Sequence, residues 1–456
     1  MIPNLTTALR LGGIPRLAFV GAGGKTTALF HLAREYHSPV LVANTAHTEL
    51  WQLALADLHL FYLDSGPLQL PPNLPGVTLL TGDRNNRSVA GVSPEGINHV
   101  LTYARQNQLP LLIEADGSRR HPVKAPADHE PPIPGFVETV VVTVGLTALG
   151  HELCSDWVHR PEIFAALSGA PLGSTISPEG ILRVLSHPSG GLKNIPPGAR
   201  RVVLLNQADT PELRAQAWEM VPHLLKDYAA VIVTALLNQQ GIDSKENPFP
   251  RSDRSPEIFS VHEPVAGVIL PSGASRRMSS PKLLFPWRGE PMIRHVVRTA
   301  LEANLAPVLV IVDAYSEEIQ AAVDGLAVQF IPNPHWEEGQ SASIQAGIKA
   351  LPRETGGAVF LLGDQPQIPA ELVCALVDAH SQTREGIIAP LIAGQPGNPV
   401  LFDRGRFGDL LKLKGDAGLR QIMEQSAAHG VPWNDPILQL DLDTPEDTQR
   451  LLNEGL

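Results

Sequence analysis

Cysteine is nearly absent from this chain of 456 residues, which has only Cys154 and Cys374. Two cysteines so far apart in the sequence exclude a disulfide framework and a cysteine-rich metal site. Long apolar runs are absent as well, because no stretch approaches the ~18 consecutive apolar residues of a membrane span. The N-terminus also lacks the pattern of a signal peptide. We therefore expect a cytoplasmic protein with no membrane partner.

Positive charge is scarce, since the formal net charge is -12. Nonspecific nucleic-acid binding needs a basic face, so we expect no nucleic-acid partner. Small anionic substrates remain compatible with this charge, because a few local Arg and Lys side chains can hold a phosphate. The chain has 43% hydrophobic and 18% charged residues, which is ordinary for a globular protein, and it is too long for a single core.

Short apolar runs alternate with longer amphipathic stretches along the whole chain. The runs lie at 16–20, 39–43, 109–116, 139–145, 201–206, 265–270, 307–312 and 358–364. Helix-like stretches include 25–36 and 211–226. This alternation predicts an α/β fold, with mainly parallel sheets covered by helices on both faces.

One segment, 238–264, breaks the alternation. It is polar and contains four prolines. The break predicts a linker at 241–263, between an N-terminal domain at 1–240 and a C-terminal domain at 264–456. Each half opens with a strand, a glycine-bearing loop and a helix, so we expect two separate phosphate-binding folds.

The glycine-bearing loop of the second half is LPSGASRRMSSPK, which follows the run at 265–270. Its Gly273 and Ser275 can turn backbone amides toward a phosphate chain, and Arg277 and Lys282 can neutralise a triphosphate. Taken alone, such a loop is more often a plain Gly/Ser turn with solvated basic residues.

Two further motifs of the second half carry aspartates. In AVFLLGDQPQIP a buried run ends and Asp364 emerges at the carboxyl edge of the sheet, where open α/β sheets place ligands. A carboxylate there suits Mg²⁺, although a turn aspartate is the simpler alternative. In LDLDTPED, Asp441 and Asp443 precede Thr444-Pro445, a pair that can begin the last helix.

These blocks together resemble the molybdenum cofactor nucleotidyltransferases, whose signature is L-x-x-G-x-S-x-R-M-G-x-P-K followed by G-D-x-P. The further blocks NPHWEEGQSASIQAG, GQPGNPVLF and LKGDAGLR follow in the order of that family. The resemblance implies a Rossmann-like domain that uses a nucleoside triphosphate and Mg²⁺.

The resemblance also implies roles for single residues. Catalytic roles fall to Arg277, Lys282 and Asp364; nucleotide binding to Leu270, Gly273, Ser275 and Ser341; and metal binding to Asp364 and Asp443, with Asp441 as an alternative to Asp443.

The loop favours one branch of that family. Ser272 stands where the guanylyl branch has a glycine, and the pair Pro281-Lys282 matches the cytidylyl branch, which implies CTP and molybdopterin as substrates. Pro271, Ser272 and Ser279 depart from the usual pattern. They leave open an acceptor such as a sugar phosphate or an isoprenoid-precursor phosphate, or a non-catalytic cofactor-binding chaperone.

The first half has its own phosphate-type loop in FVGAGGKTTALFHLA. A complete P-loop needs a glycine where Phe19 stands, six residues before the lysine. The remaining Gly21, Gly24, Lys25 and Thr26 still supply amides at a helix start, an ammonium for phosphate and a hydroxyl for Mg²⁺. This shortened loop resembles that of the Mur ligases, which makes ATP or GTP the expected ligand, whereas a glycine-rich helix cap is the alternative.

The block LLIEADGSRRHPVKAPADHEPPIP follows further along the first half. Glu114 and Asp116 stand at a strand end, where a P-loop ATPase keeps its acidic metal residue. Lys124, His129 and Glu130 lie in the proline-rich loop that follows. This loop is more polar than a simple connector needs to be, although a solvated loop is the alternative.

Two shorter motifs complete the first half. LLNQAD at 204–209 resembles the N-K-x-D guanine-binding motif of GTPases, but Gln207 replaces the lysine, so the base preference is open. VHRPE places His159 and Arg160 before a helix. With GAGGKTT and EADGSRRHPVKAP, the HRPE block resembles the YqeC-like accessory proteins of molybdenum hydroxylases, which implies a molybdenum hydroxylase as client.

Overall fold

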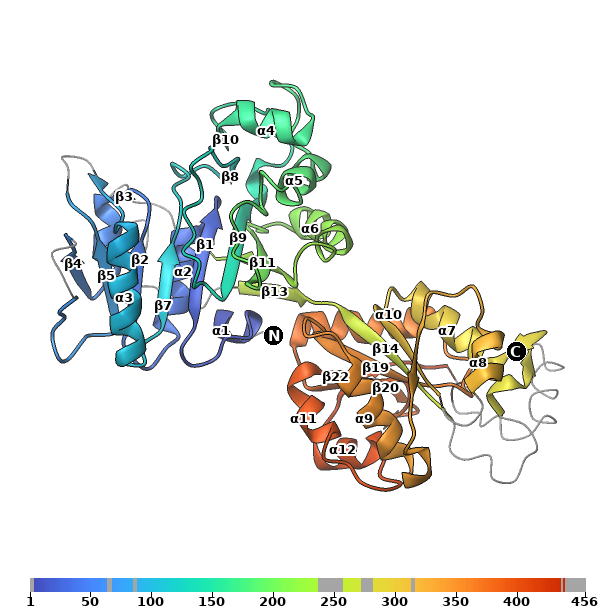
Figure 1. Cartoon of the computed structure of the whole chain (residues 1–456). Coiled ribbons are helices and arrows are strands. Elements are labelled where there is room, and N and C mark those ends of the chain that lie inside the picture. The colour runs from blue at the N-terminus through green and yellow to red at the C-terminus, as the bar shows by residue number, and fades with distance from the viewer. Residues whose placement is uncertain are drawn as a thin grey trace. The chain divides into compact units, whose positions relative to one another are not determined.

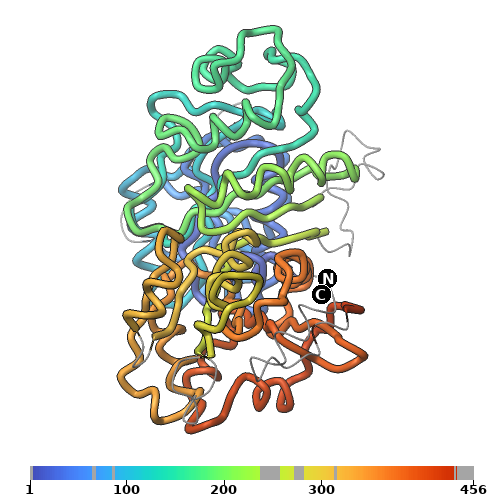
Figure 2. Tube along the Cα trace, turned by 90° about the vertical axis from the view of Figure 1, so that its right-hand side faces the viewer, coloured from blue at the N-terminus to red at the C-terminus, as the bar shows by residue number. Residues whose placement is uncertain are grey.

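The chain folds into two α/β units, as the sequence predicts. The computed structural model describes residues 4–63, 68–84, 88–236, 257–271, 282–312, 316–435 and 438. The units are Met1–His262 and Glu263–Leu456. Figure 2 shows that each is made from one continuous stretch of sequence, blue to green in the first and yellow to red in the second.

A nine-stranded sheet forms the centre of the first unit's described residues, in the order β13-β12-β11-β9-β1-β7-β2-β5-β4. All pairings are parallel except that of β13 with β12. The strands are β1 Arg16–Gly21, β2 Val40–Asn44, β4 Leu58–Phe61, β5 Val77–Thr81, β7 Leu111–Glu114, β9 Thr139–Gly145, β11 Arg200–Asn206, β12 Ala230–Ala235 and β13 Glu257–His262. Two small pairs add β3 Thr48–Glu49 with β6 Ser88–Val89, and β8 Val123–Lys124 with β10 Val158–His159.

Helices cover both faces of this sheet (Figure 1). One face packs against α3 Pro94–Gln106, α4 Pro161–Ser168, α5 Pro178–Leu185 and α6 Pro211–Leu224, and the other against α1 Leu5–Ala8 and α2 Lys25–Arg34. The short 3₁₀ helices are η1 Leu50–Leu55 and η2 Leu146–Ala148. The central strands are apolar along their whole length because both faces are covered.

The edge strand β13 corrects the predicted linker. Residues 257–262 were assigned to a linker at 241–263, but they form an antiparallel strand on β12. The prediction was wrong there because the segment is polar and rich in proline, and the short alternation of apolar and polar residues in EIFSVH was overlooked. Such a half-buried edge strand has a weaker sequence signal than a central strand.

The described residues of the second unit form an eight-stranded sheet in the order β18-β17-β14-β19-β22-β20-β21, with β23 also paired to β20. The strands are β14 Val265–Leu270, β17 Val308–Val312, β18 Gln329–Pro332, β19 Gly357–Leu362, β20 Ile387–Ile392, β21 Gln395–Pro396, β22 Val400–Asp403 and β23 His429–Pro432, with a separate pair β15 Pro286–Trp287 and β16 Glu290–Pro291. Strand β22 runs antiparallel to β19 and β20.

Helices sandwich this sheet too (Figure 1). One face packs against α7 Met292–Glu302, α8 Ser316–Ala322 and α10 Ala370–Thr383, and the other against α9 Gln340–Ala350, α11 Phe407–Leu410 and α12 Leu419–Gln425. The 3₁₀ helices are η4 Lys282–Leu284, η5 Trp336–Glu338 and η6 Arg404–Arg406.

A buried ionic cluster lies where the second unit begins. Arg384 forms an ion pair with Glu263 at 2.6 Å, and His380 Nε2 lies 2.8 Å from Asp403 Oδ2. Removing one partner from such a buried pair costs about 3–5 kcal/mol, because the other charge stays buried. The cluster lies at the start of β14 and β19, at the opposite edge from their carboxyl ends, so we assign it to the fold.

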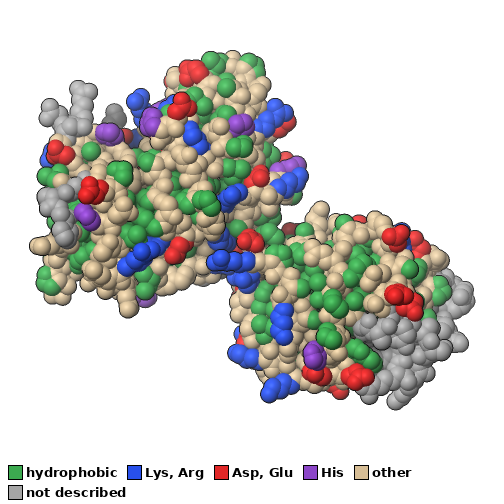
Figure 3. Space-filling view, in the orientation of Figure 1, with side chains coloured by type: hydrophobic (Ala, Val, Ile, Leu, Met, Phe, Trp, Pro, Cys, Tyr) green, Lys and Arg blue, Asp and Glu red, His purple; other side chains and the backbone are tan. Residues whose placement is uncertain are grey.

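The surface shows no broad separation of charge on the face drawn in Figure 3, where Lys and Arg side chains are interspersed with Asp and Glu. Among the residues that the structure describes, no helix is both long and apolar enough to cross a membrane.

Candidate functional site

The loop between β1 and α2 has a backbone that requires glycine. Gly21, Gly23 and Gly24 have φ angles of +95°, +72° and +114°. A Cβ on Gly21 would lie 2.2 Å from the carbonyl oxygen of Thr143, and one on Gly23 would lie 2.1 Å from the amide nitrogen of Gly145. The loop therefore packs directly on the end of β9, and only glycine combines this conformation with such close contact.

Helix α2 begins at this loop with open backbone donors. Gly24 is its N-cap and supplies no side chain to cap it. In the described part of the chain, the amides of Gly24, Lys25, Thr26 and Thr27 have no acceptor. Amides at the start of a ten-residue helix attract an anion, because the helix dipole adds to their own partial charge.

The amides nearer β1 are already bonded within the protein. Ala22 donates to the carbonyl of Thr143 at 2.8 Å, and Gly23 donates to the carbonyl of His121 at 3.1 Å. The shortened loop thus differs from a full phosphate cradle, and its open donors are those at the helix start.

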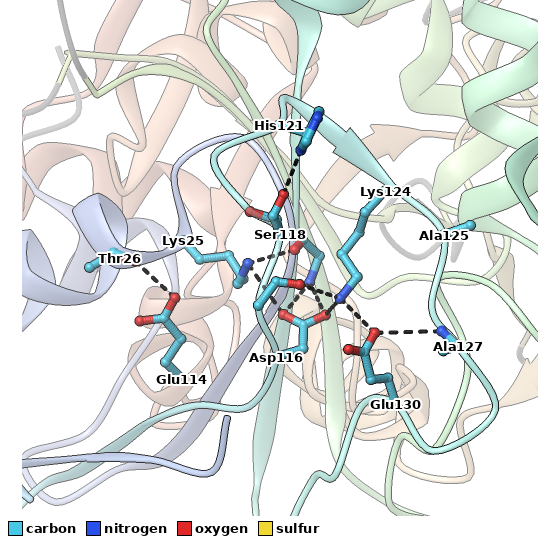
Figure 4. Close-up of polar contacts among 12 residues, drawn as sticks. Lys25, Thr26, Glu114, Asp116, Ser118, His121, Lys124, Ala125, Ala127 and Glu130 are labelled. Carbon is cyan, nitrogen blue, oxygen red and sulfur yellow. Dashed lines mark hydrogen bonds and ion pairs between the residues drawn. The ribbon is translucent and has the colours of Figure 1, made fainter. Parts of the chain in front are cut away.

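Asp116 is the centre of the polar contacts beside this loop (Figure 4). Its carboxylate accepts from the amide of Gly21 at 3.0 Å and pairs with Lys124 Nζ at 2.7 Å and with Lys25 Nζ at 3.3 Å. The Lys25 ammonium also donates to the carbonyl of Gly21 at 2.6 Å. The Asp116 carboxylate thereby holds the loop, Lys25 and Lys124 in place.

A second acid extends this network. Lys124 Nζ lies 3.0 Å from Glu130, and Arg160 holds the same carboxylate through two hydrogen bonds of 2.6 and 2.9 Å. Burial by itself raises the pKa of Glu130, but Arg160 and Lys124 outweigh that effect and lower the pKa to about 2. Arg160 has φ +67°, a conformation that this bidentate pair helps to hold.

The Glu114 side chain lies close enough to Lys25, Asp116 and Lys124 for their charges to act on it, and its hydrogen bond is to Thr26. The Thr26 hydroxyl donates to Glu114 at 2.8 Å and accepts from the Gln52 amide at 3.2 Å. Burial raises the pKa of Glu114. A hydroxyl and a carboxylate beside open helix amides fit Mg²⁺ with a phosphate.

Asp116 fits a metal less well, because both of its oxygens already have partners. No group of three His, Cys, Asp or Glu residues that could bind a metal occurs within the described ranges. Of the two acids predicted to bind a metal in the first unit, Glu114 with the Thr26 hydroxyl beside it therefore suits Mg²⁺ better.

The remaining residues predicted in the polar loop divide between the site and the surface. His129 is exposed, whereas Lys124 and Glu130 belong to the network. His159 stacks on His121 with ring centroids 5.8 Å apart. Burial, and then the charge of Arg160, lower the pKa of His159 to about 4, so this imidazole is neutral at pH 7.

A small cavity of about 40 Å³ lies beside this network and is lined by Asp116, Lys124 and apolar side chains such as Phe164 and Leu185. It has room for a few water molecules and no more.

Asn206 is a site residue whose role the sequence does not reveal. Its Nδ2 donates to the carbonyl of Gly23 at 2.7 Å, while its Oδ1 accepts from Thr234 and from the amide of Leu236, each at 3.0 Å. It ties the ends of β11 and β12 to the glycine loop. In the sequence, only its place as a polar residue at the end of an apolar run marks Asn206. Its hydrogen-bond partners could not be predicted, because they lie far away in the sequence.

The second unit brings Lys282 and Asp364 together. Lys282 opens η4, Asp364 follows β19, and their side chains pair at 2.9 Å. Both side chains are about one-seventh exposed, at 13% and 15%. Asp364 thus presents a partly accessible carboxylate at the carboxyl edge of the sheet, and a single carboxylate with phosphate oxygens is a set that Mg²⁺ accepts.

Two blocks that are far apart in the sequence meet at the start of α9. The amide of Ser341 donates to the carbonyl of Gly415 at 3.2 Å. Gly339 has φ +100°, and a Cβ there would lie 2.5 Å from Asp416. Leu270 is fully buried in the core, and its carbonyl accepts the amide of Gly363 at 3.0 Å.

Several predicted residues lie outside the described residues, and their roles stay predictions. These are Ser272, Gly273, Ser275, Arg277, Met278, Ser279 and Pro281 in the second glycine loop, and Asp441, Asp443, Thr444 and Pro445 near the C-terminus.

Comparison with known proteins agrees with this division. Residues 17–162 match the family described as YqeC protein, and residues 267–431 match the MobA-like NTP transferase domain. The second unit is thus a nucleotidyltransferase domain. The chain belongs to the YqeC family through its first unit and to the MobA-like NTP transferase family through its second.

Three similar proteins come from well-known bacteria. "Uncharacterized protein YqeC" of Escherichia coli is 34% identical over 206 residues, which cover 42% of this chain and 75% of that protein. "Purine catabolism protein PucB" of Bacillus subtilis is 31% identical over 196 residues, covering 40% of this chain and 92% of that protein. "Molybdenum cofactor cytidylyltransferase" of Escherichia coli is 24% identical over 180 residues, covering 40% of this chain and 91% of that protein.

The charge network of the first unit predicts a pH-dependent stability. The pKa of Glu130 is lowered to about 2 from an ordinary 4.5, so its stabilising effect is complete above pH 4.5 and is lost as the pH falls toward 2. We expect Glu130→Gln to lower the free energy of unfolding of the first unit by about 2 kcal/mol at pH 7, after allowance for solvent screening.

Urea unfolding of the full chain at a series of pH values from 7 to 3 measures this difference. Glu162→Gln, an exposed substitution on α4, is the matched control and should change little. A difference between wild type and Glu130→Gln that stays constant over this pH range would contradict the assigned ion pairs.

Proposed function

We propose that the second unit transfers CMP from CTP to Mo-molybdopterin and releases pyrophosphate. The observation that carries this proposal is the Lys282–Asp364 pair at the carboxyl ends of β14 and β19, within a nucleotidyltransferase domain. The similarity to a molybdenum cofactor cytidylyltransferase supports the acceptor and the nucleotide. The YqeC domain on the same chain supports a role in maturation of a molybdenum hydroxylase.

The reaction is a substitution at phosphorus. An oxygen of the acceptor phosphate forms a bond to the α-phosphorus of CTP, and the bond from that phosphorus to the bridging oxygen of the leaving pyrophosphate breaks. This chemistry needs positioning and charge stabilisation more than covalent help from the protein. Mg²⁺ held by Asp364 would neutralise part of the phosphate charge.

Lys282 has two functions in this proposal. Its Nζ lies 2.9 Å from the Asp364 carboxylate and so holds that carboxylate at the edge of the sheet before substrate binds. Its ammonium has three donors, so it can also bind phosphate oxygens beside that carboxylate. A preformed pair of this kind reduces the reorganisation needed when the charged substrate arrives.

We propose a separate role for the first unit, which binds ATP or GTP at the start of α2. Its open amides and Lys25 would bind phosphate, and Thr26 with Glu114 would hold Mg²⁺. The two phosphate sites lie in two units with separate cores. For the second unit, a sugar phosphate or an isoprenoid-precursor phosphate is the alternative acceptor. Assaying pyrophosphate release with each acceptor in turn distinguishes these from molybdopterin.

We expect Asp364→Asn to keep the fold and to abolish transfer, with turnover at least about 100-fold lower, because the neutral amide gives Mg²⁺ no charge. Pyrophosphate release at saturating CTP and Mg²⁺ measures turnover, and circular dichroism checks folding. Asp409→Asn, at an aspartate of the same unit whose side chain is 41% exposed, is the control. Turnover at the wild-type level in folded Asp364→Asn would rule out the metal role.

We expect Lys25→Ala to weaken ATP or GTP binding by about tenfold or more without changing pyrophosphate release from CTP, because it removes one charged phosphate contact from the first unit alone. Calorimetric titration and the release assay measure the two effects, with the exposed Lys226→Ala as control. A loss of CTP turnover as large as that of Lys282→Ala would instead indicate one shared site.

A further inference from the structure

Asn44 ends strand β2 with a side chain that is bonded at one end only. The residue is 3% exposed, and its Nδ2 donates to the hydroxyl of Thr48. In the described part of the chain, its Oδ1 is closed off from solvent and has no hydrogen-bond partner. Buried polar atoms in native proteins are nearly always bonded, so this oxygen needs a partner that the polypeptide does not supply.

The register of the sheet places Asn44 beside Glu114. Strand β2 runs parallel to β7, and Asn44 is the register partner of Glu114 in this pair. Neighbouring strands lie about 4.8 Å apart. The backbone also joins the two strand ends, because the amide of Thr45 donates to the carbonyl of Glu114 at 3.0 Å. The two side chains therefore leave neighbouring strands at the same level of the carboxyl edge.

Both side chains lie on the face of the sheet that α2 covers. Side chains alternate between the two faces along a strand, so Asn44 lies on the face of Val42. By the same rule, Glu114 lies on the face of Leu112. Val42 and Leu112 belong to the core cluster that packs against α2. Thr26, in the first turn of α2, bonds to Glu114 at 2.8 Å on this face. The strand geometry thus directs Asn44 toward the same helix start.

Three oxygen atoms with unused lone pairs come from these neighbouring elements. Glu114 accepts from Thr26 through Oε1, and its Oε2 has no hydrogen-bond partner among the described residues. The Thr26 hydroxyl accepts from Gln52, which leaves one of its two lone pairs unused. Asn44 Oδ1 is the third oxygen. A group of acceptors of this kind suits a cation.

The two lysines of the site have other partners. Lys25 donates to the carbonyl of Gly21 at 2.6 Å and pairs with Asp116 at 3.3 Å. Lys124 pairs with Asp116 at 2.7 Å and with Glu130 at 3.0 Å. The cation then has to come from outside the polypeptide. Carboxylate, hydroxyl and amide oxygens are ligands of hard divalent ions, so they favour Mg²⁺ or Mn²⁺ over ions that prefer sulfur or nitrogen.

We propose that Asn44 Oδ1 is a third protein ligand, with Glu114 and Thr26, of the Mg²⁺ in the first unit. This assignment rests on the Mg²⁺ site proposed above for that unit. Mg²⁺ at phosphate sites usually has one or two protein carboxylates and completes its shell with phosphate oxygens and water. A third protein oxygen lets the ion stay bound with water in place of phosphate. The first unit therefore binds its metal before the nucleotide arrives.

Mn²⁺ is the probe, because it binds oxygen ligands and electron paramagnetic resonance measures the free ion. It is titrated without nucleotide into the full chain carrying Asp364→Asn, which removes the metal ligand proposed in the second unit. The binding that a further Glu114→Gln exchange removes belongs to the first unit. For that binding, we expect Asn44→Ala to raise the dissociation constant about tenfold or more. Asn44→Asp adds a charge at the same position and should lower it by a similar factor.

Asn98→Ala and Asn98→Asp, at an exposed position of α3 in the same unit, are the matched controls and should leave the dissociation constant unchanged. Circular dichroism checks folding. Asn44→Ala introduces no buried charge, so it decides the matter by itself if Asn44→Asp does not fold.

Each outcome bears on one part of the account. Weaker binding in Asn44→Ala with tighter binding in Asn44→Asp supports the direct ligand. Unchanged binding in both variants, while Glu114→Gln abolishes it, would overturn the role of Asn44 and leave the site of Glu114 and Thr26 standing. Weaker binding in both folded variants would indicate a structural role and overturn the inference too. Mn²⁺ bound through Glu114 only when ADP or GDP is present would overturn it as well, and no such binding even then would contradict the Mg²⁺ site itself.

Discussion

The Asp116 carboxylate fixes the arrangement of the first unit's site, because it accepts from the Gly21 amide and pairs with both Lys25 and Lys124. The two lysines allow Asp116 to be buried, at 2% exposure, since a lone carboxylate at that depth would be costly. If Lys25 binds a phosphate, as we propose, Lys124 still neutralises Asp116. The loop then keeps its glycine conformation while one cation changes partner.

The two units place a lysine and an acidic residue together in different ways. In the first, Lys25 emerges at the start of α2 and its acidic partner lies on a neighbouring strand end. In the second, Lys282 and Asp364 pair at the carboxyl edge of the sheet. Both place one ammonium and one carboxylate where parallel strands end, and there we propose that a polyphosphate binds with Mg²⁺.

The central strands follow from the sequence, because strands such as β9 and β14 are buried on both faces and therefore form unbroken apolar runs. The edge strand β13 was missed, since its alternating residues lie in a polar segment. Candidate site residues could be proposed from the sequence where they are adjacent in it, as with Lys25 and Thr26, and their roles stay predictions. Contacts over long sequence separations were not predictable: Arg160 meets Glu130, and Asn206 meets Gly23, only through the fold.

The central claim is that the second unit is a cytidylyltransferase for the molybdenum cofactor. The most direct measurement is pyrophosphate release by the full chain with Mg²⁺ and Mo-molybdopterin, with each of the four nucleoside triphosphates in turn. The account predicts release with CTP that depends on the acceptor, and much less with GTP, ATP or UTP. Equal release with GTP, or release with CTP only when a sugar phosphate or an isoprenoid-precursor phosphate replaces molybdopterin, would contradict it.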